Sequence, residues 1–332
     1  MLSYLNGPQS DPFHYIYSSR GWLTDYDPPG PFPFFLNLEP TNACQLDCLF
    51  CSRQMSERPL GRVDLGTAAA LMDEVARHPG TAVRFTGWGE PLLHPQIDEL
   101  VKIVKERGIP LKIYTNGLAL TDALTDAILA LEVDDLQFSM QGLNEKQYLF
   151  NRVGGDYEKL CRNIERVSRK RGGQKKPFLS ILTSVLADEL EEESPEDFTA
   201  KWLGTVDKVG VDLTNLNFVR HLDRLSPHLG RQSAGLRRGR CVDVFLALEV
   251  KYDGLIQYCG QDSRSLPEHV IGRFPEMTLS EAWLGEAMEE RRNKVGRALG
   301  HEQFPVCRNC YHNTDKYDAF KKRLSGGQEN GQ

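Results

Sequence analysis

The sequence predicts an α/β fold built on a parallel sheet, either a barrel or an open sheet, followed by a small α+β domain. Six short apolar segments have the character of strands, at residues 34–38, 82–86, 111–115, 136–139, 179–183 and 211–213. Amphipathic helical stretches lie between most of them, for example at residues 67–77, 97–106 and 157–167. Strand–helix alternation at this spacing is typical of βαβ units around a parallel sheet. Such sheets bind ligands at the carboxyl ends of their strands.

The sequence pattern changes after about residue 222. A basic segment at residues 235–240 leads to Cys241, and Asp253-Gly254 lies between two short strand-like runs, which predicts a tight hairpin. A helix over residues 280–295, a cysteine pair and a short C-terminal helix are expected to follow. We therefore expect an irregular leader over residues 1–32, a core domain over 33–221, a small second domain over 222–325 and a disordered tail over 326–332.

Composition and charge exclude several classes of protein. The 332 residues carry 40 Lys and Arg against 46 Asp and Glu, a balance that offers no general attraction to nucleic acid or to anionic lipid. No stretch is long and apolar enough to span a membrane, and the N-terminus lacks a secretory signal, so we expect a cytoplasmic protein. In that reducing compartment disulfides are rare, so those of the 8 cysteines that are clustered are expected to bind metal.

The first of two cysteine groups has the spacing C-x3-C-x2-C and comprises Cys44, Cys48 and Cys51, directly after the first predicted strand. Three thiolates on one short loop can face a common centre, as iron–sulfur clusters require. Three ligands for a four-iron cluster leave one iron open for chemistry. The alternatives are a structural zinc ion completed by a distant fourth ligand, and chance spacing.

The second group comprises Cys241, Cys259, Cys307 and Cys310, with two members near the predicted hairpin and two in a C-x2-C pair. Four thiolates suit either a fully ligated iron–sulfur cluster or an all-thiolate zinc site. The eighth cysteine, Cys161, shares an apolar helical face with its neighbours, so we interpret it as a core residue.

Four segments, in order, resemble the motifs of the radical S-adenosylmethionine (SAM) superfamily. Residues 38–51, LEPTNACQLDCLFC, resemble its cysteine signature loop. Residues 86–92, TGWGEPL, resemble its glycine–glycine–glutamate motif, with Trp88 between the two glycines. Residues 114–117, YTNG, and 138–142, FSMQG, followed by Arg152, resemble the ends of its third and fourth strands. The resemblance covers about residues 33–221 and implies a partial (β/α)6 TIM-like barrel.

This resemblance implies that the first cysteine group holds a [4Fe-4S] cluster whose open iron chelates the methionine amino and carboxylate groups of SAM. In the family pattern, Glu90 and the backbone of residues 87–89 receive the methionine ammonium. Ser139 and Arg152 hold the ribose or the methionine carboxylate, and Phe50 lies near the adenine. The implied SAM contacts are therefore Phe50, Gly87, Trp88, Gly89, Glu90, Ser139 and Arg152.

The second cysteine group resembles the C-terminal SPASM/twitch extension of this superfamily, which binds auxiliary [4Fe-4S] clusters. Gly254 lies between the first two of these cysteines, as in that extension, and the C-x2-C pair follows after a gap. The full SPASM pattern has more cysteines downstream, so the resemblance implies one auxiliary cluster with four cysteine ligands. A fully ligated cluster favours electron transfer and hence a net two-electron oxidation, while a purely structural role is the alternative.

In this family, a reduced cluster cleaves SAM to give a 5′-deoxyadenosyl radical that abstracts a hydrogen atom from a C–H bond. By resemblance to its compact members, we expect dehydrogenation of a C–OH carbon in a polar small molecule, a sugar or aminocyclitol of antibiotic-type biosynthesis. His221 and Arg220 are candidates for the base that takes the hydroxyl proton, with Asn215 and Asn217 nearby. The expected partners are this substrate and a low-potential reductant of flavodoxin or ferredoxin type, with no nucleic acid and no membrane.

Three alternatives stay open. The first is an enzyme that modifies peptides or proteins, although many such enzymes carry an N-terminal peptide-recognition domain for which the expected leader is too short. The second is a sugar epimerase, against which the interpretation of Cys161 as a core residue counts, because an epimerase needs a hydrogen-atom donor. The third is a non-catalytic iron–sulfur or zinc module, which predicts no cleavage of SAM.

Overall fold

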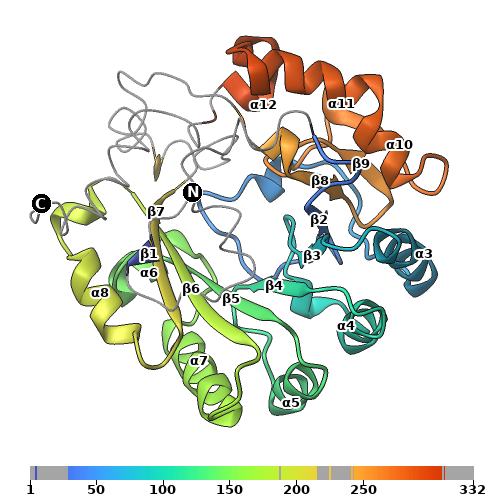
Figure 1. The fold of residues 1–332 in the computed structure, drawn as a ribbon. Helices are drawn as coiled ribbons and strands as arrows, with labels where there is room; N and C mark the ends of the chain where they lie inside the picture. Colours follow the sequence, from blue (N-terminus) through green and yellow to red (C-terminus); the bar gives the residue numbers. More distant parts are fainter. Residues whose placement is uncertain are drawn as a thin grey trace, which may run out of the picture.

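A computed structural model describes residues 4–5, 29–186, 188–214, 224–225, 241, 243–308 and 310. Its strands form one ten-stranded sheet in the order β1-β7-β6-β5-β4-β3-β2-β8-β9-β10. The sheet curves, and α3, α4, α5, α7 and α8 lie around its outside (Figure 1). No helix among the described residues is both long and apolar enough to cross a membrane.

The predicted α/β core is confirmed as a partial barrel of six parallel strands. All six predicted strands are present, each hydrogen-bonded in parallel to the next along the chain. The strands are β2 (Phe35–Leu38), β3 (Ala82–Phe85), β4 (Leu111–Thr115), β5 (Asp135–Gln141), β6 (Phe178–Val185) and β7 (Lys208–Leu213). The helices between them are α3 (Leu65–Ala76), α4 (Ile97–Lys105), α5 (Asp122–Ala130), α6 (Glu145–Asn151), α7 (Tyr157–Arg171) and α8 (Pro195–Trp202).

The alternation of side chains along each strand explains how the barrel forms. Leu136, Phe138 and Met140 of β5 point into the apolar core that the strands share with the helices. The residues between them, such as Gln137 and Ser139, point to the other face, because successive strand residues alternate. Helices α3, α5, α6, α7 and α8 each start at a polar residue whose side chain caps them. Asp64, for example, accepts a hydrogen bond of 2.9 Å from the Thr67 backbone nitrogen.

The sheet continues across the predicted boundary between the two domains. Strand β8 (Ala247–Val250) pairs in parallel with β2, and β9 (Leu255–Gln257) pairs antiparallel with β8. The hairpin turn predicted at Asp253-Gly254 is present, and Gly254 has a φ of 82° that favours glycine. Strand β10 (Val270–Arg273) extends the sheet beyond β9, and β1 (Tyr4–Leu5) pairs with β7 at the other edge.

The single helix predicted over residues 280–295 is wrong. The structure has α10 (Leu279–Leu284), α11 (Glu286–Arg291) and a π-helical turn (Arg292–Arg297). Gly285 separates the first two because its ψ of 164° is extended, and a glycine in a helical pattern costs about 1 kcal/mol relative to alanine. Helix α12 (Pro305–Arg308) carries Cys307. The expected C-terminal helix and the tail at 326–332 lie outside the described residues.

Short 3-10 turns complete the connections between these elements. They lie at Ser52–Met55, Pro91–Leu93, Glu189–Glu191, Asp243–Phe245, Pro267–His269 and His301–Gln303.

Candidate active site

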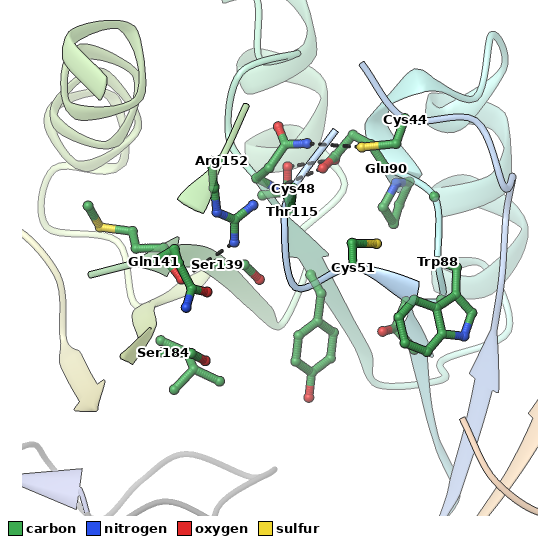
Figure 2. Close-up of a pocket in the computed structure, with 18 of the residues that line it drawn as sticks. Cys44, Cys48, Cys51, Trp88, Glu90, Thr115, Ser139, Gln141, Arg152 and Ser184 are labelled. Atoms are coloured by element: carbon green, nitrogen blue, oxygen red, sulfur yellow. Dashed lines mark hydrogen bonds between the residues drawn. The ribbon is translucent and has the colours of Figure 1, made fainter. Parts of the chain in front are cut away.

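A cavity of about 280 Å³ opens at the carboxyl ends of the first parallel strands. Arg152, Gln141 and Ser184 lie on one side of it, and Cys51 and Trp88 lie on the other (Figure 2). Every residue predicted for the first cysteine group and for SAM binding lines this cavity: Cys44, Cys48, Phe50, Cys51, Gly87, Trp88, Gly89, Glu90, Ser139 and Arg152. The fold therefore brings together four segments that are separated by up to about a hundred residues in the chain.

The sequence interpretation assigned no role to several other residues that line the cavity: Thr86, Pro91, Tyr114, Thr115, Asn116, Met140, Gln141, Leu182 and Ser184. Most of them belong to the motifs at the strand ends. Their place in these motifs was the sequence signal that could have predicted a position at the cavity. Leu182 and Ser184 lie in no motif. Only the alternation along β6, which places Ser180, Leu182 and Ser184 on one face, points to them.

The cysteine loop is tied by its backbone to the segment that carries Arg152. The Asp47 nitrogen donates to the Val153 carbonyl and the Leu49 nitrogen donates to the Asn151 carbonyl, both at 2.9 Å. Arg152 lies between these two anchors, with its guanidinium carbon 5.6 Å from the centroid of the Phe50 ring. These two backbone hydrogen bonds therefore hold the Arg152 guanidinium beside the cysteine loop.

The three cysteines of this loop are free thiols and partly or fully buried. Burial raises the pKa of all three, that of Cys51 to about 12. The neighbouring cysteines raise the pKa of Cys51 further, while Arg152 and Arg53 lower that of Cys48. Thiols in this environment ionise when a cation binds among them, as iron does in a cluster.

The donor set therefore fits an iron–sulfur cluster. Among the described residues, no three His, Cys, Asp or Glu side chains have the arrangement of a site for a single metal ion. The fit rests instead on the chemistry of three clustered thiols beside a cavity.

Gly89 allows the loop after β3 to pack directly on the cysteine loop. A Cβ atom at this position would lie 2.0 Å from the Thr41 carbonyl oxygen and 2.8 Å from that of Ala43. The next residue completes the contact, because the Glu90 nitrogen donates to the Ala43 carbonyl at 2.8 Å. Gly87 has a φ of 124°, which favours glycine. The glycine motif therefore has a steric cause, and Trp88 between the glycines does not disturb it.

The Glu90 carboxylate connects the loop after β3 to the end of β4 by hydrogen bonds. It is 2% exposed and accepts hydrogen bonds from the Thr115 hydroxyl at 2.7 Å and from the Asn116 backbone nitrogen at 2.7 Å. The Leu92 nitrogen donates to it at 3.2 Å. Burial raises the pKa of Glu90, although these hydrogen bonds lower it in part. A carboxylate has about four lone-pair positions, and Glu90 uses three of them here, so it can still accept a hydrogen bond from the ammonium group of a ligand. Binding of the methionine ammonium by Glu90 stays a prediction.

Three buried polar atoms around the cavity have no hydrogen-bond partner in the described part of the chain: Trp88 Nε1, Gln141 Oε1 and Arg152 Nε. Buried polar groups of folded proteins are nearly always paired, with protein, water or ligand. An amino acid–nucleoside conjugate such as SAM carries polar groups of both kinds, donors and acceptors. The cavity therefore fits SAM in its polarity, and its volume is near the lower end of small-molecule sites.

The second cysteine group is also brought together by the fold. Cys241 precedes β8, Cys259 follows β9, and Cys307 and Cys310 lie at α12 and just after it. Burial raises the pKa of Cys241 and Cys259 well above the ordinary value, and the other cysteines of the group raise it further. The Cys310 nitrogen donates to the Cys307 carbonyl at 3.2 Å. The four thiols therefore lie near enough to influence one another, while no three of them have the arrangement of a site for a single metal ion.

The predicted bases and Cys161 are not among the described residues that line the cavity. His221 and Arg220, the candidate bases, lie outside the described residues, as do Asn215 and Asn217. Cys161 is half-buried on α7 and packs against the core, as predicted, and does not line the cavity.

Comparison with known proteins agrees with this geometry. Residues 38–197 match the family described as the Radical SAM superfamily. The tungsten-containing aldehyde ferredoxin oxidoreductase cofactor-modifying protein of Pyrococcus furiosus is 32% identical over 167 residues, which are 49% of this chain and 46% of that protein. The PqqA peptide cyclase of Ruegeria pomeroyi is 33% identical over 126 residues, 38% of this chain and 33% of that protein. The chain thus spans half or less of the length of these relatives.

Among solved structures, BtrN in complex with AdoMet and 2-DOIA has a similar fold. The TM-score is 0.57 and the sequence identity 18%, and the match covers 83% of this chain and 92% of BtrN. The family match includes the cysteine loop, the glycine motif and the β4 and β5 ends that surround the cavity. Residues 38–197 therefore form a domain of the radical SAM superfamily, and the fold of the chain is similar to that of BtrN.

Proposed function

We propose that this radical SAM enzyme is a dehydrogenase that oxidises a C–OH carbon of a polar small molecule, such as a sugar or an aminocyclitol. The hydrogen atom is abstracted at the cavity, and the hydroxyl proton passes to a base, for which His221 and Arg220 stay the candidates. The remaining electron passes to an auxiliary [4Fe-4S] cluster held by Cys241, Cys259, Cys307 and Cys310. The observation that carries the substrate class is the polar inner face of the barrel.

That inner face is unusual for a barrel of parallel strands. The interior of a closed (β/α)8 barrel is filled mainly by Val, Ile and Leu. Here the inward positions of consecutive strands are occupied by Asn37, Arg84, Lys112, Asp135 and Gln137. Lys112 and Asp135 form a buried ion pair of 3.0 Å. A polar interior favours a substrate with hydroxyl or amino groups over an apolar one.

The polar lining reaches the cavity itself. Ser139, Gln141 and Ser184 line the cavity and continue the inner face of β5 and β6. Gln141 donates to the Thr214 hydroxyl, which fixes the amide and directs its unpaired oxygen away from that contact. These groups can orient a substrate hydroxyl by hydrogen bonds, and the buried walls exclude water from the reacting carbon.

The chain's own residues have distinct tasks in this proposal. Cys44, Cys48 and Cys51 hold the first cluster, and Arg152 lies beside it to balance negative charge. Glu90 and its hydrogen bonds fix the ends of β3 and β4, where the methionine part of SAM is expected. When bound, SAM and the reduced cluster supply the radical that abstracts the hydrogen atom.

Two comparisons support different substrates. BtrN, whose fold covers most of this chain, was solved with the small molecule 2-DOIA, which supports a small-molecule substrate. The relative named PqqA peptide cyclase acts on a peptide, which supports peptide modification as the second candidate. The polar lining and the volume of about 280 Å³ favour the first, because both are typical of a site for a small molecule.

The test is anaerobic reconstitution, reduction and incubation with SAM and a panel of aminocyclitols, aminoglycoside precursors and peptides. We expect 5′-deoxyadenosine, and a product two mass units lighter than one small molecule. Deuterium at the oxidised carbon should appear in the deoxyadenosine. The variant Cys51→Ala is the matched control and should give neither product.

Two results would contradict the proposal. A modified peptide in place of an oxidised small molecule would establish the second candidate. Iron and sulfide contents near four per chain, instead of eight, would remove the auxiliary cluster.

A further inference from the structure

Tyr258 lies against the second cysteine group. It precedes Cys259 directly, is 2% exposed, and its hydroxyl oxygen is 3.9 Å from the Cys307 sulfur. The contact joins the end of β9 to α12, so it depends on the folded arrangement and not on local sequence. No motif of the sequence marked this tyrosine.

The Tyr258 ring is held on several sides. The His269 ring meets it edge-on at a centroid distance of 5.5 Å, and the Phe304 ring lies at 6.1 Å. The Arg291 guanidinium carbon is 4.8 Å from the Tyr258 centroid. His269 is itself fixed by Asp262, whose carboxylate is 2.8 Å from Nδ1. The hydroxyl therefore has little freedom to turn away from Cys307.

The direction of the hydrogen bond follows from the chemistry of a cluster ligand. An iron-bound cysteine is a thiolate and carries no proton, so its sulfur accepts and the phenol donates. Hydrogen bonds to the sulfurs of a cluster, together with burial, are among the factors that set its reduction potential. Reduction adds negative charge to the cluster, and a donor stabilises the reduced form more than the oxidised form.

We propose that Tyr258 is a positioning residue that raises the reduction potential of the auxiliary cluster through its hydrogen bond to Cys307. In the reduction, one electron moves onto the cluster, no bond forms or breaks, and the phenol keeps its proton. The electron is the one left on the substrate after hydrogen abstraction. This inference rests on the proposed function, because it requires a cluster on the second cysteine group.

The experiment isolates the auxiliary cluster in the full-length chain. Substitutions Cys44→Ala, Cys48→Ala and Cys51→Ala remove the first cluster, and the remaining one is titrated by EPR against redox potential, with and without Tyr258→Phe. We expect a more negative midpoint potential in the phenylalanine variant, at unchanged iron and sulfide content. Tyr252→Phe is the matched control, because its hydroxyl donates to the Pro59 carbonyl instead of a cysteine, and should leave the potential unchanged.

An unchanged midpoint potential in Tyr258→Phe, with the cluster in place, would overturn the inference and leave the proposed function standing. Absence of iron from the triple-alanine protein would overturn both.

A second measurement needs no change at Tyr258. Tyrosine deuterated at the ring carbons beside the hydroxyl is incorporated into the triple-alanine protein, and pulsed EPR of the reduced cluster detects nearby deuterium. We expect a deuterium coupling, since the hydroxyl end of the Tyr258 ring faces Cys307. Its absence would overturn the inference even if the phenylalanine variant failed to fold.

Discussion

Gly89 lies where the loop after β3 crosses the cysteine loop after β2. The Thr41 carbonyl oxygen occupies the space that a side chain would need, at 2.0 Å from the ideal Cβ position. The obstacle is backbone, which cannot rotate away as the end of a flexible side chain can. The same contact positions Ala43, and with it the first cysteine of the loop. A side chain at this position would therefore displace the cysteines proposed to hold the cluster, and it would also reduce stability.

For Gly89→Ala we expect a loss of about 1–3 kcal/mol in the free energy of unfolding, the usual cost of forcing an extra carbon into a packed site. We also expect less iron bound after reconstitution. Urea unfolding and iron analysis measure the two effects. Gly173→Ala is the control, because nothing lies within 4 Å of its ideal Cβ. Equal behaviour of the two variants would contradict this account of the glycine motif.

At the scale of the elements, the Asp134 carboxylate links the amino ends of β4, β5 and β6. Asp134 precedes β5 and accepts hydrogen bonds from the Leu111 nitrogen of β4 at 2.9 Å and from Lys176, before β6, at 2.6 Å. Lys105 at the end of α4 also donates to it. Burial alone would raise the pKa of Asp134, but the two lysines and the backbone bond outweigh it and lower the pKa.

Because its pKa is lowered in the folded state, Asp134 stabilises the fold above the unfolded-state pKa of 3.8, and this contribution is lost as the pH falls through the lower folded-state value. We expect Asp134→Asn to reduce the free energy of unfolding at pH 7 by about 1.5–3 kcal/mol. The difference from the parent should shrink on acidification. Urea unfolding across this pH range measures it.

Asp126→Asn, which removes an exposed partner of Lys170, serves as the control for Asp134→Asn. It should change stability by about 1 kcal/mol at most. A constant difference between Asp134→Asn and its parent at all pH values would show that charge is not the cause.

The sequence predicted those elements whose signal is local. The first four parallel strands each combine a short apolar run with a motif at the carboxyl end, while β6 and β7 have the apolar run alone. The existence and the order of these strands could therefore be inferred. The pairing of β8 with β2 has no local signal. A strand after residue 222 has the same sequence pattern whether it joins the core sheet or forms a separate one. The break at Gly285 was missed because the amphipathic pattern continues through it.

The same distinction holds at the candidate site. Cysteine spacing and glycine motifs identified the residues that have unusual chemistry or no side chain. Ser184, Leu182 and Tyr258 are ordinary residues whose importance comes only from what the fold places beside them.

Across the whole molecule, a buried ion pair of the core also contacts the C-terminal region. Arg58, after the cysteine loop, binds both oxygens of Glu39 at 2.8 and 2.9 Å. Its Nε also donates to the Ser263 carbonyl at 3.3 Å. Glu39 in turn accepts from the Trp88 nitrogen at 3.2 Å. One arginine thus connects β2, the glycine motif and the segment after β9.

For Arg58→Met we expect a loss of about 3–5 kcal/mol in the free energy of unfolding, because Glu39 would be left buried without its partner. Arg162→Met is the matched control. Its pair with Glu158 is exposed, with side chains 63% and 74% accessible, and should contribute about 0.5 kcal/mol or less. Urea unfolding of both variants measures the difference. Similar losses in the two variants would contradict a buried bridge between the regions.

The parallel pairing of β2 with β8 also constrains the order in which the chain folds. Asn37 and its partner Glu249 are 212 residues apart. At bacterial or eukaryotic rates of synthesis, roughly 10–40 s pass between the appearance of one and of the other. During that interval one edge of β2 is unpaired, and an open edge invites association with other chains. We therefore expect the nascent barrel to be most prone to association with other chains until β8 has left the ribosome and paired with β2.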